Sequence, residues 1–262
     1  MDNYEASWAE CRRRVVYAIT ERRSGHLCAS MSVLDILLVL LQREWEPDSR
    51  TFSGDVVLSK GHAAPALYAV LGFLDDSLPP LSGLLRRINS PYEGHPRNHA
   101  LNGVLVSTGS LGLGLAWSVG RAIASERLGR DRYVSVVVSD GELQCGISYE
   151  ALRVAARESP TRLRIIVDHN GWQTDGPTVA DPSVMLRSLG LSVHDVDGHD
   201  PQSIQAGLEL QREGPVVLVA RTKRCAGLGM PFELGPEIYG ESIDSDSAAL
   251  LVNVASGQSR VQ

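Results

Sequence analysis

The stretch that decides the fold runs from residue 134 to residue 176. It contains two apolar runs that each end in oxygen-bearing side chains: VSVVV at 134–138 before SDGE at 139–142, and LRIIV at 163–167 before DHN at 168–170. Short β-branched runs of this kind are typical of strands buried on both faces of a parallel sheet. A helical pattern from Ser148 to about Arg157 separates them, so the two strands should be neighbours.

Asp140 and Asn170 follow these two strands directly, and the carboxyl ends of parallel strands meet at one edge of a sheet. Carboxylate, amide and backbone carbonyl oxygens are ligands that suit Mg²⁺ or Ca²⁺, and Mg²⁺ commonly takes its other ligands from water and phosphate. Gly141 would let a phosphate approach the backbone without a Cβ in the way. Either polar residue alone is also an ordinary turn residue, and only the pairing favours a metal site.

The same alternation of strands and helices extends along the chain. We expect further strands at 55–58, 192–196 and 215–221 and helices at 63–74, 81–88, 115–128, 182–189 and 201–212. Near the start, Trp8, Cys11, Val15 and Ile19 recur at helical spacing, and Ser32 is expected to cap a second helix at 33–44. The pattern predicts an α/β fold, with one domain at 1–240 and a polar tail at 241–262. Its sheet is expected to be mostly parallel, with helices on both faces.

Composition narrows the function classes. A net charge of −6 with scattered basic residues argues against nucleic acid as the main partner. The chain has no apolar run of about 18 residues and its start lacks the basic and apolar regions of a signal peptide, so we expect a cytoplasmic location and no membrane segment. The four cysteines show no metal-binding spacing, and we expect them to be reduced thiols: Cys11, Cys28, Cys145 and Cys225.

Three histidines stand out because each follows a glycine at a predicted element boundary: His26, His62 and His95. A lone histidine is usually a satisfied structural residue. A glycine-rich segment, STGSLG at 107–112, precedes a predicted helix, where backbone N–H groups can bind a phosphate or simply allow close packing. Taken together with Asp140 and Asn170, these motifs resemble the transketolase family in its N-terminal half.

The resemblance runs in order from about residue 24 to residue 240. It rests on SGH at 24–26, LSKGHA at 58–63, GHP at 94–96, TGSLG at 108–112, DGELQ at 140–144 and DHNGWQTDG at 168–176. It implies a thiamine diphosphate-binding fold, with thiamine diphosphate and Mg²⁺ (or Ca²⁺) as cofactors. In that chemistry the cofactor is the nucleophile and electron sink, and the protein positions it and handles protons.

The resemblance also implies roles for individual residues. Asp140, Asn170 and the backbone carbonyl of Trp172 would bind the metal ion. The cofactor-binding residues would be His62, Gly109, Ser110, Leu111, Gly141, Glu142 and Asn170, with Gly141 and His62 at the diphosphate and Gly109 and Leu111 at the aminopyrimidine ring. The catalytic residues would be His62, which also faces the reacting carbon, and the substrate-facing His26 and His95.

Transketolases take the glutamate that activates the aminopyrimidine from a second, pyrimidine-binding domain, which this sequence does not contain. The resemblance therefore implies one subunit of a split, two-component transketolase, which would need a second subunit carrying that domain and would form an α₂β₂ assembly by analogy. The pair would move a two-carbon ketol unit from a ketose-type donor to an acceptor. The chain alone is expected to show no turnover.

Three positions depart from the family pattern. Ser139 stands where a glycine is usual, Cys145 lies where the family usually has Gln-Glu-Gly, so that a glutamate is missing, and Tyr239 stands where a histidine is usual. We interpret Cys145 as a small buried hydrophobe. Because two polar groups around the substrate have changed, we expect a specialised ketol transfer, for example in a biosynthetic pathway, rather than one in central sugar metabolism.

Two other functions stay open at this point. The first is an E1 α-type subunit of a 2-oxo acid dehydrogenase, against which the GHP and SKGH motifs weigh. The second is a non-catalytic scaffolding subunit, which the changes at Cys145 and Tyr239 favour and the retained Asp140 and Asn170 oppose.

Overall fold

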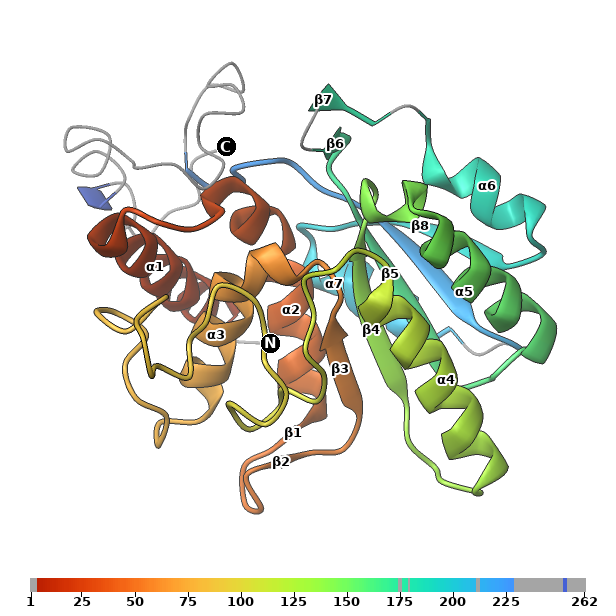
Figure 1. Ribbon diagram of the computed structural model, residues 1–262, viewed down its shortest axis with the longest axis horizontal. Helices are drawn as coiled ribbons and strands as arrows, with labels where there is room; N and C mark the ends of the chain where they lie inside the picture. The colour runs from red at the N-terminus through yellow and green to blue at the C-terminus, as the bar shows by residue number, and fades with distance from the viewer. Residues whose placement is uncertain (1–3, 174–175, 179, 211–212, 229–251, 254–262) are drawn as a thin grey trace.

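Five parallel strands form the central sheet of the computed structural model (Figure 1). The structure describes residues 4–173, 176–178, 180–210, 213–228 and 252–253. The sheet strands, in spatial order, are β3 (Asp55–Leu58), β4 (Val134–Ser139), β5 (Leu163–His169), β9 (Val216–Arg221) and β8 (Ser192–Asp197). Two-residue strands form two small antiparallel pairs: β1 (Trp45–Glu46) with β2 (Thr51–Phe52), and β6 (Trp172–Gln173) with β7 (Gly176–Pro177).

Helices cover both faces of the sheet, as the sequence predicted (Figure 1). On one face lie α1 (Tyr4–Arg22), α2 (Leu27–Glu44), α3 (Ala64–Leu74) and α7 (Pro201–Leu208). On the other lie α4 (Leu113–Arg127), α5 (Gly146–Glu158) and α6 (Pro182–Ser188). Two short 3₁₀ helices, η1 (Gly61–Ala63) and η2 (Glu142–Gln144), follow β3 and β4.

The apolar strands contribute side chains to two hydrophobic cores, one on each side of the sheet. Val137, Ile166 and Leu218 point into the core shared with α1, α2, α3 and α7. Their neighbours Val136 and Val138 point into the core shared with α4, α5 and α6. Side chains alternate between the two faces of a strand, so a strand covered on both faces must be apolar throughout. This explains why 134–138 and 163–167 are nearly continuous apolar runs.

One predicted helix boundary and one predicted helix are wrong. The second helix begins at Leu27, not after Ser32, so Ser32 lies inside α2. The hydroxyl of Ser32 donates to the Ala29 carbonyl and to Asp168 Oδ2, so it is satisfied without acting as a cap. The predicted helix at 81–88 is also absent, because Gly83, Arg86 and Asn89 have left-handed backbones, which interrupt a right-handed helix.

The other predicted strands and helices lie within a few residues of their expected bounds. Tyr239 and nearly all of the predicted tail at 241–262 lie outside the described residues. Within the described part of the chain, no helix combines the length and the apolar character needed to cross a membrane.

Candidate cofactor site

The ends of β4 and β5 bring Asp140 and Asn170 to one edge of the sheet, as the sequence predicted. Ser139 pairs with Asp168 as the last pair between the two strands, and β5 continues for one further residue, His169, so Asp140 and Asn170 each directly follow the end of their strand. Asp140 is 3% exposed. Its Oδ2 accepts the Gly171 N–H at 2.7 Å and lies 2.9 Å from Nδ1 of His169. These contacts hold the Asp140 carboxylate in one orientation, and His169 is therefore a positioning residue that sequence reasoning missed.

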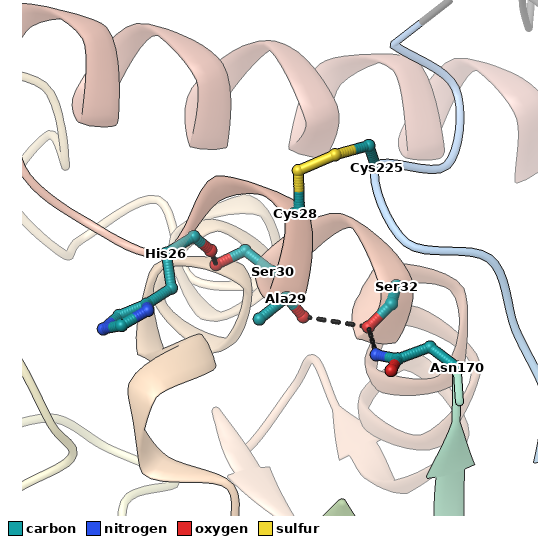
Figure 2. Close-up of a disulfide and its surroundings, with 7 residues drawn as sticks. All are labelled: His26, Cys28, Ala29, Ser30, Ser32, Asn170 and Cys225. Carbon is teal, nitrogen blue, oxygen red and sulfur yellow. Dashed lines mark hydrogen bonds between the residues drawn. A yellow bond between two sulfur atoms is a disulfide. The ribbon is translucent and has the colours of Figure 1, made fainter. Parts of the chain in front are cut away.

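Asn170 and Trp172 meet in the turn that follows β5. The Asn170 side-chain oxygen accepts the Trp172 N–H at 3.0 Å, and its amide nitrogen donates to the Ser32 hydroxyl at 3.2 Å (Figure 2). Gly171 has a φ of 75°, a left-handed conformation that favours glycine. The turn thus places Asn170 and Trp172 next to Asp140, whose carboxylate accepts the Gly171 N–H of the same turn.

A cavity of about 210 Å³ opens at this edge of the sheet. Six residues predicted to contact the cofactor or its metal line it: His62, Leu111, Gly141, Glu142, Asn170 and Trp172. Asp140, Gly109, Ser110, His26 and His95 do not line it, although the neighbours of Asp140 in the chain, Ser139 and Gly141, do. Both residues predicted at the diphosphate therefore line the cavity, as does Leu111 of the two predicted at the ring, whereas the substrate-facing His26 and His95 do not.

The three predicted histidines come from three separate elements and approach one another. The rings of His26 and His62 stack edge to face with centroids 5.1 Å apart. The ring of His95 lies against Gly109, where an added Cβ would come within 2.9 Å of the His95 Cδ2 atom. Gly109 also has a φ of 133°, so a side chain is disfavoured there on both counts.

All three imidazoles favour their neutral form. Burial lowers the pKa of His26 to about 4, and the charge of Arg86 adds to this shift. Burial also lowers the pKa of His62 well below its ordinary value, with a further contribution from Lys60. The pKa of His95 is lowered by burial and by Arg86. At neutral pH these histidines can therefore exchange a proton or hydrogen-bond a hydroxyl group without carrying a charge.

Glu142 lines the cavity, but its carboxylate is bound by the protein itself. Oε1 accepts the Ser59 hydroxyl and the Gly112 N–H, the latter at 2.7 Å, and Oε2 accepts the Ser139 N–H at 3.3 Å. Burial raises the pKa of this carboxyl group, and these hydrogen bonds oppose the shift. In the structure, Glu142 ties the ends of β3 and β4 to the start of α4.

A buried ion pair between Lys60 and Asp168 forms another part of the cavity region, and sequence reasoning missed it. Lys60 is 1% exposed and Asp168 is 0% exposed. Asp168 Oδ2 accepts from Lys60 Nζ and, at 2.6 Å, from the Ser32 hydroxyl, while Oδ1 accepts from Thr222. A signal was present in the sequence, because Lys60 lies two residues after the apolar strand β3 and Asp168 lies within the apolar strand β5, where solvent is excluded.

The expectation of four reduced thiols is wrong for one pair. Cys28 and Cys225 form a disulfide across 197 residues of sequence (Figure 2). No short-range spacing could reveal this pair, because the fold alone brings the two segments together. Cys11 and Cys145 are free, and Cys145 is partly exposed at the start of α5 rather than buried as predicted.

The residues of this edge fit a diphosphate held through a divalent metal ion. The oxygen donors match what Mg²⁺ prefers, and no group of three His, Cys, Asp or Glu side chains within the described ranges offers a softer alternative. Lys60 and Arg224 give the cavity wall positive charge, which suits a polyanion. At Gly141 an added Cβ would come within 3.0 Å of the Gln173 side chain, so the site favours glycine at this position.

Comparison with known proteins gives a consistent result. Residues 5–251 match the family described as transketolase, thiamine diphosphate binding domain. Transketolase 2 of Escherichia coli (strain K12) is 33% identical over 258 residues, which cover 89% of this chain and 38% of that protein. One subunit of the apulose-4-phosphate transketolase of Actinobacillus succinogenes is 34% identical over 254 residues, which cover 91% of this chain and 90% of that protein.

The fold agrees with these matches. The crystal structure of transketolase from Campylobacter jejuni superposes with a TM-score of 0.84 at 26% sequence identity, covering 98% of this chain and 43% of that one. The chain therefore spans less than half of two of these relatives and nine-tenths of the third.

Proposed function

We propose, because this chain belongs to the transketolase family, that it is the diphosphate-binding subunit of a two-component, thiamine diphosphate-dependent transketolase. The observation that supports the proposal is the cavity at the ends of β4 and β5, which is lined by Asn170 and Trp172 from the predicted metal site and by Gly141 and His62 from the predicted diphosphate contacts. The match to 91% of this chain by a relative that is itself a single subunit of a transketolase supports the two-component form. We expect the assembly to be α₂β₂ and its location to be the cytoplasm.

Each residue of the edge has a part in holding the cofactor. Asp140, Asn170 and the Trp172 carbonyl would bind Mg²⁺, and His169 keeps the Asp140 carboxylate oriented. Gly141 and His62 would contact the diphosphate, and Leu111 at the cavity wall would contact the ring. Bound thiamine diphosphate supplies a carbon nucleophile and an electron sink for cleaving a carbon–carbon bond next to a carbonyl.

The histidines would handle the substrate's hydroxyl groups. A neutral His62 can hydrogen-bond a hydroxyl or accept its proton, and His26 is close enough to orient the His62 ring. His95, packed against Gly109 at the start of the glycine-rich segment, would reach the same substrate from the other side. These roles require no ionised imidazole, which agrees with the lowered pKa values of His26 and His62.

Reconstitution tests the proposal. The polypeptide that co-purifies with this chain is expected to supply the pyrimidine-binding half, and the pair is assayed with a panel of ketose phosphates that includes apulose 4-phosphate. We expect ketol transfer by the pair, none by the chain alone, and loss of activity in Asp140→Ala. Turnover by the chain alone would refute the two-component form.

The same assay separates the two other functions. An E1 α-type subunit would turn over a 2-oxo acid with an artificial electron acceptor and leave the ketose phosphates unused. A scaffolding subunit would bind its partner with no Mg²⁺-dependent binding of thiamine diphosphate. The complete network around Asp140 and Asn170 favours the transketolase over the scaffold.

A further inference from the structure

The segment after β9 reaches back to the start of α2, and the disulfide joins them (Figure 2). β9 ends at Arg221, and Cys225 lies beside Cys28 in the first turn of α2. The Cys225 N–H also donates to the Cys28 carbonyl at 3.4 Å. The disulfide is thus a covalent link between two segments that both border the proposed cofactor site.

Each cysteine has a direct neighbour in the cavity wall. Ala29 follows Cys28, and Arg224 precedes Cys225; both line the cavity. One side of the cavity therefore belongs to α2 and another to the segment after β9. Because the linked residues adjoin these walls, the disulfide limits how far the two walls can separate.

Arg224 brings positive charge to this cavity. It is 8% exposed, and its guanidinium carbon lies 5.1 Å from the centroid of the Trp172 ring, a cation–π contact. Arg224 thus adds a second cationic side chain to the wall beside Lys60, which pairs with Asp168. A guanidinium offers a planar set of donors that binds phosphate oxygens in pairs.

The backbone at Cys225 links the disulfide to the position of Arg224. Cys225 has a φ of 55°, a left-handed conformation that is disfavoured for any residue with a Cβ. Neighbouring anchors flank it: the Lys223 N–H donates to His199 Nε2 at 2.8 Å, and the Gly227 carbonyl accepts from Arg12 at 3.1 Å. Without the crosslink, Cys225 can relax to a right-handed conformation, and Arg224 would turn with it.

We propose that Arg224 binds the diphosphate of the cofactor and that the reversible Cys28–Cys225 disulfide holds it in place. The proposal rests on the proposed function. A dithiol reductant would open the link by two thiol–disulfide exchanges: one thiolate attacks a protein sulfur, the second resolves the mixed disulfide, and the reductant leaves oxidised while both cysteines become thiols. A cytoplasmic disulfide that can open in this way fits a redox-sensing role.

Binding of inorganic pyrophosphate with Mg²⁺ to the full chain tests this by calorimetry, before and after dithiothreitol treatment, with thiols counted in each state. We expect reduction to weaken binding about tenfold, the usual effect of losing one charge-assisted hydrogen bond. Arg224→Gln should be equally weak in both states, and Cys28→Ser/Cys225→Ser should match the reduced chain. Cys145→Ser, which changes a free cysteine, should respond to reduction as the native chain does.

Three outcomes would overturn the proposal. Four thiols after treatment with glutathione disulfide would show that the pair does not form. Equal affinity in the two states, with thiol counts that differ, would show that the disulfide does not position Arg224. An Arg224→Gln variant that binds as tightly as the oxidised native chain would remove Arg224 from the site.

A separate optical readout distinguishes this proposal from the proposed function. If neither state binds pyrophosphate or thiamine diphosphate, the proposed function fails. The fluorescence of Trp172, isolated by subtraction of a Trp172→Phe variant, still reports whether Arg224 moves on reduction. A redox-dependent change supports the link between the disulfide and Arg224, and an unchanged spectrum refutes it.

Discussion

Replacing Lys60 with Met should destabilise the chain strongly, because it leaves the Asp168 carboxylate buried without its cation. Asp168 is 0% exposed, and its remaining partners would be the hydroxyls of Ser32 and Thr222. Breaking one half of a buried ion pair typically costs about 3–5 kcal/mol of unfolding free energy. For a chain of this size that corresponds to a fall in melting temperature of roughly 6–20 °C.

Urea unfolding followed by circular dichroism measures this cost, with the midpoint expected to fall and the slope to stay unchanged. The double variant Lys60→Met/Asp168→Asn should recover about 2 kcal/mol, because a neutral amide can accept from one hydroxyl through its oxygen and donate to the other through its nitrogen. The control Arg127→Met removes an exposed ion pair with Glu158 and should cost less than about 0.5 kcal/mol. A cost below about 1 kcal/mol for Lys60→Met, or no recovery in the double variant, would refute the reasoning.

Three further predictions concern the histidines, the glycine-rich segment and Glu142. The pKa of His26 is about 4 in the fold, so only the unfolded chain takes up a proton at this residue as the pH falls from 6.5. The free energy of unfolding should therefore drop by about 0.7 kcal/mol per pH unit, which is half the full linkage value because the ring is only partly buried. In urea titrations at a series of pH values, His26→Asn should flatten this dependence. Gly112→Ala should lower the free energy of unfolding by about 2–4 kcal/mol, because Gly112 has a φ of 83° and a Cβ there would clash with the start of α5. The control Gly120→Ala, which has open space around it, should leave the melting temperature unchanged or slightly raised. Glu142→Ala should lower the melting temperature even without cofactor, since it leaves buried N–H groups unpaired; an unchanged melting temperature would mean that Glu142 serves the cofactor alone.

The sequence predicted the sheet well because burial on both faces leaves a local signature. The runs at 134–138 and 163–167 must be apolar at every position, so they could be recognised without knowing their partners. The helix start at Leu27 could not be recognised in the same way. Ser32 resembles a cap locally, and its hydrogen-bond partner Asp168 lies 136 residues away.

The parts of the site that escaped prediction depend on such distant contacts. Lys60 is bonded to Asp168 across 108 residues, and Cys28 is joined to Cys225 across 197. Arg224 was not predicted as a site residue, because no residue near it in the sequence indicates a cavity. By contrast, Asp140 and Asn170 were predicted together because neighbouring parallel strands place their ends at one edge.

Binding of thiamine diphosphate to the chain and its partner, titrated with and without Mg²⁺, tests the central claim most directly. We expect binding to require the metal ion, and Asp140→Asn to weaken it by about 100-fold while leaving the circular dichroism spectrum unchanged. Asp131→Asn, which alters an acid that is paired with Arg162 at the surface, should bind as the native chain does. Metal-independent binding, or full affinity in Asp140→Asn, would contradict the assignment of this sheet edge as the anchor for the cofactor's diphosphate.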